Sequence, residues 1–254
     1  MLKISVVIPV FNASKSIKDA LNSIVNQSYQ PYEIIIINDC STDGSNEIIE
    51  KFTLGSSNIF FIDLKVNSGV SFCRNLGWNK SSGDYVAFLD SDDIWNLNKL
   101  SIMVKAIELN YPDLIGHAYN EKKEKINISP NFNGKYLNEI GFYKLLLRNR
   151  FQTSCVLINS KIKERFNETI SHSEDYELFL RMAAKKQKIY YYKEQLTDLG
   201  RPQLTEGGLS GNKLKMRKGE IKAYRSAFKI RKLRFLLPFG IFFSFLKYII
   251  KMYR

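Results

Sequence analysis

The chain has 254 residues, of which 44% are hydrophobic and 25% charged, and its net charge is +13. This composition is typical of a globular protein, and the length suits one large domain or one domain with an appendage. No run of about 18 apolar residues occurs, which excludes a strong transmembrane helix candidate. The three cysteines are odd in number and far apart. They predict no disulfide framework and favour a reducing compartment.

The first hundred residues alternate between strand and helix patterns. Strands are expected at residues 4–9, 33–38, 58–64 and 85–89, and helices at 15–26, 43–52 and 70–79. This alternation predicts βαβ units and an α/β fold with a mainly parallel, doubly wound sheet and helices on both faces. In the less regular second half we expect strands at 111–119, 152–158 and 189–192, and helices at 136–150 and 175–184.

The segment after the fourth predicted strand, Asp90-Ser91-Asp92-Asp93, places three acids within four positions. In an open α/β sheet, ligands bind beyond the carboxyl ends of the strands. Carboxylates crowded there repel one another unless a cation lies among them, and Mg²⁺ or Mn²⁺ commonly bridges carboxylates to substrate phosphates. Capping of the next helix would explain one of these acids but not three. The segment therefore predicts an enzyme that acts on a phosphorylated donor.

Two earlier turns belong to the same edge of the predicted sheet. Residues 9–12 follow the first strand, and residues 38–45 follow the second. Clusters of Ser, Thr, Asp and Gly such as the one at 38–45 also occur in ordinary turns into helices. Neither turn carries a glycine-rich dinucleotide or P-loop motif, which argues against a dehydrogenase and against a P-loop NTPase. A nucleotide held by acids and a metal is the remaining interpretation.

Five segments together resemble a known family. They are Val6-Val7-Ile8-Pro9-Val10-Phe11-Asn12, Asn38-Asp39-Cys40-Ser41-Thr42-Asp43-Gly44-Ser45, Asn67-Ser68-Gly69 with Arg74-Asn75, Asp90-Ser91-Asp92-Asp93, and Ser173-Glu174-Asp175-Tyr176-Glu177-Leu178. Their order and spacing resemble the successive motifs of the family 2 inverting glycosyltransferases, which have the GT-A fold. The resemblance implies a GT-A domain with a Rossmann-like sheet, and Mn²⁺ or Mg²⁺ as cofactor.

The resemblance also implies a site for a UDP-sugar donor. Asp39 would accept a hydrogen bond from the uracil ring, Asp90 would contact the ribose, and Asp92 would ligate the metal between the two phosphates. That metal would act as a Lewis acid on the departing nucleoside diphosphate. Arg74 would lie near the diphosphate or order the acids, unless it is an ordinary surface arginine. The further donor-side residues are Pro9, Val10, Phe11, Asn12, Asn67, Gly69 and Ser91, with Asp93 in a supporting role.

On the acceptor side, the family's Glu-Asp pair resembles Glu174 and Asp175. Asp175 would take the proton of the acceptor hydroxyl as it attacks the anomeric carbon, and Glu174 would support the acceptor. Ser173 or Asp175 would also suit a helix cap, a role compatible with catalysis. The adjacent His172 is a candidate for metal or phosphate, although a lone histidine is more often neither. The glycine-rich segment 200–210 is expected to be a lid whose Arg201 reaches the diphosphate, or a plain surface loop.

Positive charge is concentrated at the C-terminal end. Residues 213–254 contain thirteen Lys and Arg against one acid, a net charge of +12, which leaves the rest of the chain at +1. Residues 214–230 have the pattern of an amphipathic basic helix. The apolar block 235–246, broken by Pro238 and Gly240, is too short to span a membrane. Basic residues beside aromatic ones predict an anchor on an anionic membrane surface, with packing as core or dimer interface as the alternative. Nucleic acid fits poorly, because the aromatics do not interleave with the charges.

We therefore expect a glycosyltransferase domain at residues 1–210, with a nucleotide-sugar half (1–95) and an acceptor half (96–210), and a membrane-associating region at 211–254. The expected activity is inverting transfer of a hexose or N-acetylhexosamine from a UDP-sugar to a saccharide on a polyprenyl diphosphate lipid, in O-antigen or capsule synthesis. The N-terminus does not resemble a signal peptide, so we expect a cytoplasmic protein at the inner face of the membrane. A non-catalytic binding module and a nucleotidyltransferase are the alternatives, and the oligomeric state stays open.

Overall fold

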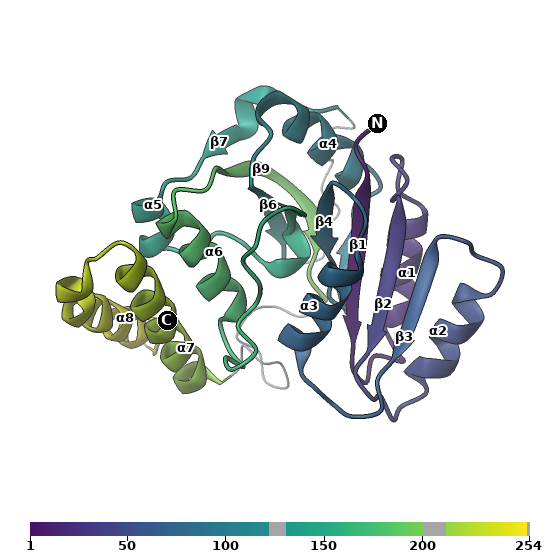
Figure 1. Cartoon of the computed structure of the whole chain (residues 1–254), viewed down its shortest axis with the longest axis horizontal. Coiled ribbons are helices and arrows are strands. Elements are labelled where there is room, and N and C mark those ends of the chain that lie inside the picture. Colours follow the sequence, from purple (N-terminus) through teal and green to yellow (C-terminus); the bar gives the residue numbers. More distant parts are fainter. Residues whose placement is uncertain (122–130, 201–211, 253–254) are drawn as a thin grey trace.

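A computed structural model describes residues 1–121, 131–200 and 212–252 of the chain (Figure 1). Its centre is one mixed sheet with the strand order β3-β2-β1-β4-β8-β6-β9-β5, and β7 pairs with β9 beside this path. The strands are β1 (Ile4–Val10), β2 (Glu33–Asn38), β3 (Ile59–Asp63), β4 (Tyr85–Phe88), β5 (Ile94–Trp95), β6 (Leu114–Asn120), β7 (Leu137–Glu139), β8 (Val156–Asn159) and β9 (Ile189–Asp198). The helices are α1 (Ile17–Val25), α2 (Ser45–Thr53), α3 (Val70–Lys80), α4 (Lys99–Asn110), α5 (Phe142–Leu147), α6 (Glu174–Ala184), α7 (Lys213–Ile230) and α8 (Leu237–Met252).

The N-terminal half is the parallel, doubly wound sheet that the sequence predicts. β1 pairs in parallel with β2 and β4, and β2 pairs in parallel with β3. Successive side chains of a strand point to opposite faces. Ile35 and Ile37 of β2 accordingly belong to the core that contains α3 and α6, whereas Ile34 and Ile36 belong to the core that contains α1 and α4. This burial on both faces explains why β2 is a continuous apolar run.

The strand registers bring the carboxyl ends of the parallel strands to one edge. Val10 at the end of β1 lies opposite Asn38 at the end of β2, which lies opposite Asp63 at the end of β3. β4 runs beside β1, with Phe88 opposite Val7. The turns after β1, β2 and β4 therefore share this edge, as the sequence predicts.

The second half departs from the prediction in several places. β8 pairs antiparallel with β4 and β6, while β6 and β9 are parallel. The predicted helix at 136–150 is wrong, because residues 137–139 pair with β9 as β7 and only the shorter α5 follows. β9 continues past the predicted residue 192, because its second part pairs with β6 and β5. The predicted strand at 152–158 begins as a 3₁₀ turn, η2 (Thr153–Cys155), and β5 and α4 were not predicted.

The C-terminal region forms two helices, α7 and α8, on the side of the molecule away from β3 and α2 (Figure 1). α7 packs on α6, with the rings of Tyr176 and Tyr224 6.3 Å apart edge to face. The apolar block is helical, as predicted for this region: its first residues belong to a 3₁₀ turn, η4 (Arg234–Leu236), and α8 follows at Leu237. Pro238 stands in its first turn, where a missing backbone N–H costs no helical hydrogen bond. Within the described parts of the chain, no helix is long and apolar enough to cross a membrane.

Candidate active site

Hydrogen bonds from side chains join the turns after β1 and β2. Asn12 Oδ1 accepts from the backbone N of Thr42 at 2.9 Å, and Asp43 Oδ2 accepts from the backbone N of Ser14 at 2.8 Å. Burial would raise the pKa of Asp43, but hydrogen bonds from Ser45 and Ser14 outweigh it and lower the pKa to about 2. Asp43 therefore braces the turn, as expected for an ordinary turn into a helix.

The first turn presents fewer side chains to the edge than we predicted. Pro9 and Val10 are buried within β1, so only their backbone is available to a nucleotide. The ring of Phe11 is 52% exposed. It is the aromatic surface at this edge on which a base can stack.

Asp39 holds the turn that begins α3. Its Oδ1 accepts from the backbone N of Ser68 at 2.7 Å, and its Oδ2 accepts from that of Gly69 at 2.9 Å. Gly69 has a φ of +88°, which favours glycine. Asn67 Nδ2 donates to the carbonyl of Asp39 at 3.2 Å. Each carboxylate oxygen has a second lone pair, so Asp39 keeps the capacity to accept a further hydrogen bond.

Arg74 on α3 connects the predicted donor half to the predicted acceptor half. One guanidinium nitrogen donates to Asp90 Oδ1 at 2.6 Å, and another donates to Glu174 Oε1 at 2.9 Å. The arginine side chain is only 4% exposed, so the alternative of an ordinary surface arginine is wrong. Burial alone would lower the pKa of Arg74, but the two carboxylates outweigh it and raise the pKa. The side chain therefore stays charged and orders acids from two distant motifs.

The acid segment 90–93 forms the loop between β4 and β5. The next helix, α4, begins only at Lys99, so capping of that helix does not explain the acids. Asp90, Ser91 and Asp92 are partly exposed, while Asp93 is buried and accepts from the backbone N of Gly200 at 2.9 Å. Burial, reinforced by Asp90 and Asp92, raises the pKa of Asp93 to about 7. The rest of the predicted lid, with Arg201, lies outside the described residues.

Asp175 is the second residue of α6 and is half-buried. Its Oδ1 accepts from the backbone N of Tyr176 at 2.6 Å. Burial and then the neighbouring Glu174 raise the pKa of Asp175 to about 7, against the opposing charge of Arg74. A carboxylate with this pKa is a stronger base than a solvated aspartate, and it lies beside the cluster that holds the donor-side acids.

α7 supports the turn that leads into α6. A Cβ at Gly219 would lie 1.9 Å from the carbonyl oxygen of His172, so only glycine allows this approach. The hydroxyl of Ser173 donates to the carbonyl of Met216 at 3.3 Å and makes no side-chain cap for α6. Ser173 therefore occupies the N-cap position of α6, but its hydroxyl makes no capping hydrogen bond. His172 is buried and its Nδ1 is 2.9 Å from Ser171 Oγ, and burial lowers the pKa of the imidazole.

The donor atoms of the acid loop suit a divalent cation. Mg²⁺ is usually bound by one or two carboxylates together with substrate phosphates, and Asp90 and Asp92 offer such oxygens at the open edge. Among the residues that the structure describes, no three His, Cys, Asp or Glu side chains are placed to hold a metal ion, and His172 joins no such group. A cation bound at Asp92 would need further ligands, such as substrate phosphates or water.

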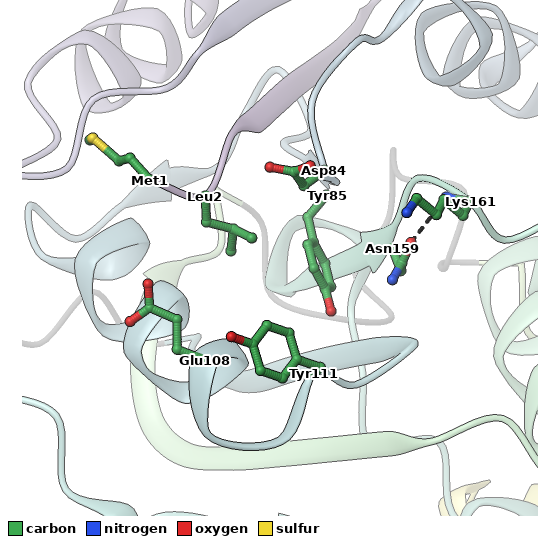
Figure 2. A pocket seen from close by; sticks show the side chains of 8 residues that line it. All are labelled: Met1, Leu2, Asp84, Tyr85, Glu108, Tyr111, Asn159 and Lys161. Atoms are coloured by element: carbon green, nitrogen blue, oxygen red, sulfur yellow. Dashed lines mark hydrogen bonds between the residues drawn. The ribbon is translucent and has the colours of Figure 1, made fainter.

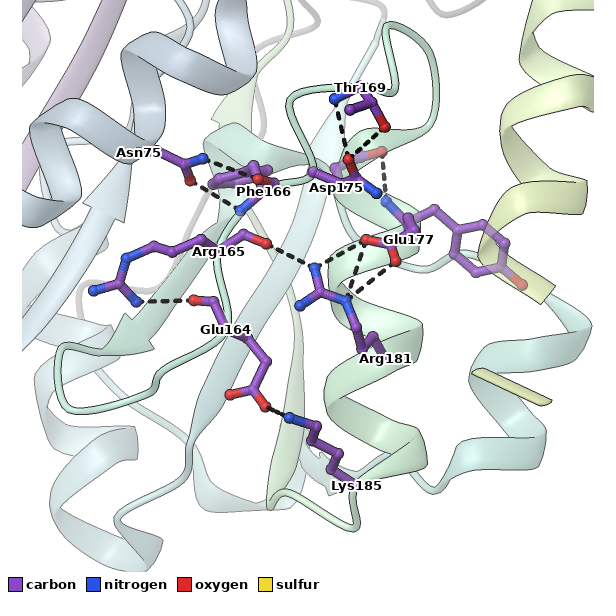
Figure 3. A network of polar contacts seen from close by, with 11 residues as sticks. Asn75, Glu164, Arg165, Phe166, Thr169, Asp175, Glu177, Arg181 and Lys185 are labelled. Carbon is purple, nitrogen blue, oxygen red and sulfur yellow. Dashed lines mark hydrogen bonds and ion pairs between the residues drawn. The ribbon is translucent and has the colours of Figure 1, made fainter. Parts of the chain in front are cut away.

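A polar network that the sequence did not reveal fixes the segment before α6 (Figure 3). Asn75 pairs with the backbone N and O of Phe166, both at 2.9 Å. On α6, Arg181 pairs with Glu177 at 2.9 Å and donates to the carbonyl of Arg165 at 2.7 Å. In the sequence, this network was indicated only by Asn75, the polar residue directly after Arg74.

A hollow of about 400 Å³ lies away from the acid loop and from Asp175 (Figure 2). Its position is at the amino ends of β1 and β4, the edge opposite to the acid loop. It is lined by Met1, Leu2, Asp84, Tyr85, Glu108, Tyr111, Asn159 and Lys161. It takes no part in the candidate active site.

Several known proteins resemble the chain in sequence. TuaG of Bacillus subtilis, described as a putative teichuronic acid biosynthesis glycosyltransferase, is 41% identical over 97 residues, which are 38% of each protein. An uncharacterized glycosyltransferase of Haemophilus influenzae is 31% identical over 216 residues, 84% of this chain and 83% of the relative. WfgD of Escherichia coli, a UDP-Glc:alpha-D-GlcNAc-diphosphoundecaprenol beta-1,3-glucosyltransferase, is 28% identical over 179 residues, 70% of this chain and 68% of WfgD. The chain thus spans well under half of TuaG and most of the other two.

Solved structures and a family profile agree with this picture. Staphylococcus aureus TarS in complex with UDP-GlcNAc superposes with a TM-score of 0.66 at 20% identity, over 89% of this chain and 67% of TarS. The mannosyltransferase PcManGT of Pyrobaculum calidifontis, solved with GDP-Man and Mn²⁺, gives a TM-score of 0.68 at 13% identity, over 96% and 73%. These likenesses show the GT-A fold. The profile described as "Glycosyl transferase family 2" matches residues 5–164, and the chain therefore belongs to glycosyl transferase family 2.

Proposed function

We propose that the protein is an inverting glycosyltransferase that moves a hexose or N-acetylhexosamine from a UDP-sugar to a saccharide carried on a polyprenyl diphosphate lipid, for a surface polysaccharide. The observation that carries this proposal is the position of Arg74 between Asp90 and Glu174, at 2.6 and 2.9 Å. Arg74 thereby joins the predicted donor acids to α6, the helix that carries the predicted base. Transfer between two substrates requires the donor site and the base to lie close together. The support for a UDP-sugar donor is the complex of TarS with UDP-GlcNAc. The support for a lipid-linked acceptor is the name of WfgD, which describes transfer to a diphosphoundecaprenol-linked sugar.

Asp175 is the proposed general base. In a single displacement, the acceptor hydroxyl attacks the anomeric carbon on the face opposite to the departing UDP. The carboxylate of Asp175 receives the hydroxyl proton as the new glycosidic bond forms, so the configuration at the anomeric carbon inverts. The raised pKa of about 7 gives this carboxylate the proton affinity the step needs, and a base near the working pH is the efficient choice.

The donor side of the mechanism belongs to Asp39, Phe11 and the acid loop. We propose that the uracil stacks on the exposed ring of Phe11 and donates to Asp39, while Asp90 orients the ribose. Asp92 would hold Mn²⁺ or Mg²⁺, and when bound the ion supplies positive charge to the diphosphate. Arg74 keeps Asp90 in place, because its buried guanidinium has both Asp90 and Glu174 as partners.

We further propose that α8 attaches the enzyme to the inner, anionic face of the cytoplasmic membrane. Four phenylalanines at spacings of three or four residues are 60–70% exposed: Phe235, Phe239, Phe242 and Phe245. Phe239, Phe242 and Phe245 belong to α8, where this spacing places them along one side of the helix, and Phe235 lies in the preceding 3₁₀ turn η4 (Arg234–Leu236). The exposed Lys232 and Arg234 precede them. Exposed aromatics beside basic residues suit insertion into an anionic lipid surface, and α7 would carry this attachment to α6 and the base.

The function is tested by incubating the protein and Mn²⁺ with a panel of UDP-sugars and a polyprenyl-diphosphate-linked saccharide. We expect a glycosidic product from one donor, with the anomeric configuration in its NMR spectrum opposite to that of the donor. Asp175→Asn should lower the rate of product formation by about 10²–10⁴, whereas Asp84→Asn, at the opposite edge of the sheet, should leave it unchanged. A retained configuration contradicts inversion, and UDP binding without turnover would indicate a binding module. Release of pyrophosphate in a parallel incubation with UTP and sugar 1-phosphates would indicate a nucleotidyltransferase.

A further inference from the structure

A buried lysine lies behind the acid loop, and the proposed chemistry does not use it. Lys99 is the first residue of α4 and has no exposed surface. Its Nζ is 3.4 Å from the centroid of the Trp95 ring and 2.7 Å from the carbonyl oxygen of Ser154. Burial drives the pKa of Lys99 well below its ordinary value. An apolar side chain of the same length would avoid the cost of removing an amine from water. The contacts of Lys99 therefore need an explanation other than packing.

Those contacts converge on Ser154, in the η2 turn. The carbonyl oxygen of Ser154 accepts from Lys99 Nζ at 2.7 Å, from Trp95 Nε1 at 2.9 Å and from Thr197 Oγ1 at 3.4 Å. These donors come from α4, β5 and β9, three elements that surround η2. The backbone of Ser154 is consequently fixed from three directions.

The side chain of Ser154 connects this fixed backbone to the acid loop. Its hydroxyl oxygen accepts from the backbone N of Asp90 at 3.0 Å, and the hydroxyl is also hydrogen-bonded to the carboxylate of Asp93. A hydroxyl has one donor and two acceptor positions, so the two bonds are compatible. One serine therefore contacts both ends of the loop that presents Asp90, Ser91 and Asp92.

The other side of the loop is held by the end of β9. Gly200 N donates to Asp93 Oδ1 at 2.9 Å, and a Cβ at position 200 would lie 1.8 Å from the carbonyl oxygen of Asp92. β5 and β9 are paired at this place, with Trp95 opposite Thr197. Because Trp95 and Thr197 also donate to Ser154, the same frame holds the loop from both sides.

We infer that Ser154 and Lys99 are positioning residues that hold the acid loop in the geometry it needs for the donor diphosphate and its cation. Ser154 acts on the loop directly, and Lys99 acts through the carbonyl of Ser154. The inference rests on the proposed function for its effect on catalysis, but the hydrogen bonds themselves do not depend on it. Misplacing a reacting group by about 1 Å can cost about a hundredfold in rate.

The test uses the full chain with Ser154→Ala, Ser154→Thr and Lys99→Met. Thr153→Ala serves as the matched control, because it removes a neighbouring buried hydroxyl of the same turn. We expect Ser154→Ala and Lys99→Met to weaken binding of UDP in the presence of Mn²⁺ by about tenfold, the worth of one hydrogen bond in a charged site. The KM for the acceptor should change little, and Ser154→Thr should restore the affinity. Lys99→Met should lose affinity even though its melting temperature stays the same or rises.

Hydrogen–deuterium exchange of the peptide that contains residues 89–93 provides a readout that needs no substrate. Exchange at the Asp90 amide should accelerate in Ser154→Ala and stay unchanged in Thr153→Ala. If exchange and UDP affinity both match the parent in Ser154→Ala, the positioning role is overturned. A second outcome separates the two proposals: exchange accelerates in Ser154→Ala, but neither the parent nor any variant binds UDP or transfers sugar. In that case the proposed function fails, while the role of Ser154 in holding the acid loop stands. Equal losses in Thr153→Ala would reduce the effect to packing and also overturn the inference.

Discussion

Replacing Asp175 by asparagine should stop sugar transfer and, at the same time, stabilise the protein at high pH. The pKa of this carboxyl is raised from 3.8 to about 7, first by burial and then by Glu174. Because the folded-state pKa lies above the unfolded-state value, the carboxyl's contribution to stability is complete below pH 3.8 and is lost as the pH rises through about 7. At pH 8 the ionised carboxylate therefore opposes folding.

The magnitude follows from the shift in pKa. At about 1.4 kcal/mol per unit, a rise of about 3 units corresponds to at most about 4 kcal/mol, and partial exposure of the side chain reduces this. Asparagine is neutral and nearly equal in size, and its Oδ1 can still accept from the N–H of Tyr176. We expect the free energy of unfolding at pH 8 to rise by about 2–4 kcal/mol, and the gain to shrink below about 2 kcal/mol at pH 5. Transfer should fall by about 10²–10⁴, the usual worth of a general base.

The assay combines urea unfolding at pH 5 and pH 8, without UDP, with transfer rates measured across this range. The rate of the parent enzyme should rise through about pH 7 as Asp175 loses its proton. Glu174→Gln is the matched control with the opposite sign, because it removes a partner of the buried Arg74 and should lower stability at both pH values. An Asp175→Asn protein that transfers sugar at the parental rate, or gains no stability at pH 8, would refute the reasoning and move the base elsewhere, with Glu174 next in line.

Three further variants test other parts of the site and the tail. Asp92→Asn should lose the stabilisation that UDP with Mn²⁺ gives, about 2.7 kcal/mol at 100 times the dissociation constant; an undiminished shift in melting temperature means that Asp92 is not a ligand. Arg74→Met should lower the free energy of unfolding in urea by about 3–5 kcal/mol. It should also shift the pH–rate profile to higher pH, because the charge of Arg74 lowers the pKa of Asp175. Phe239→Ser with Phe242→Ser should release the protein from anionic vesicles in a sedimentation assay, whereas Phe60→Ser, a 49% exposed phenylalanine on β3, should not; a change from dimer to monomer would instead show an interface between copies.

Point substitutions on α8 are preferable to removal of the segment 231–254. Ser244 on α8 donates to Glu220 Oε2 at 2.7 Å, and Tyr224 donates to the other oxygen of this buried glutamate, also at 2.7 Å. Gly240 lies against the rings of Phe228 and Tyr224. A truncation would therefore leave a buried carboxylate with fewer partners and uncover core residues. Loss of vesicle binding in such a protein would not separate the lipid contact from the fold.

The fold of the first hundred residues could be predicted because its signals are local. The four isoleucines of β2 need no partner to be read as a buried strand, and every predicted boundary in this region falls within two residues of the observed one. The error at 136–150 has a different cause. Leu137 and its neighbours become β7 only because Tyr190, Tyr191 and Tyr192 of β9 offer a free edge, and local propensity yields to such a distant partner. α4 was missed although Leu100, Met103, Val104 and Ile107 follow helical spacing.

The site was predicted as a set of motifs but not as a set of contacts. Asp39 follows β2, and Asp90 and Asp92 follow β4. These parallel strands lie on either side of β1, and the rule for sheet edges places their carboxyl ends at the same edge. No comparable rule links Arg74 to Glu174, which are 100 residues apart in the sequence, or Asn75 to the backbone of Phe166, 91 residues away. Ser154 carried no signal at all, because its function depends on the three elements whose donors meet at its carbonyl. Pairings of this kind require the fold.

For the tail, the sequence left two alternatives: packing as core and contact with a membrane surface. The structure allows each of them for a different helix. α7 packs as core: Ala223, Tyr224, Ala227 and Phe228 are buried, and Gly219 touches the turn that leads to Asp175. α8 instead exposes Phe239, Phe242 and Phe245. A membrane contact made by α8 would therefore be two packed helices away from the base, since α8 packs on α7 and α7 packs on α6. On this arrangement, attachment to a lipid surface would fix the orientation of the acceptor half toward a substrate that is itself anchored in the membrane.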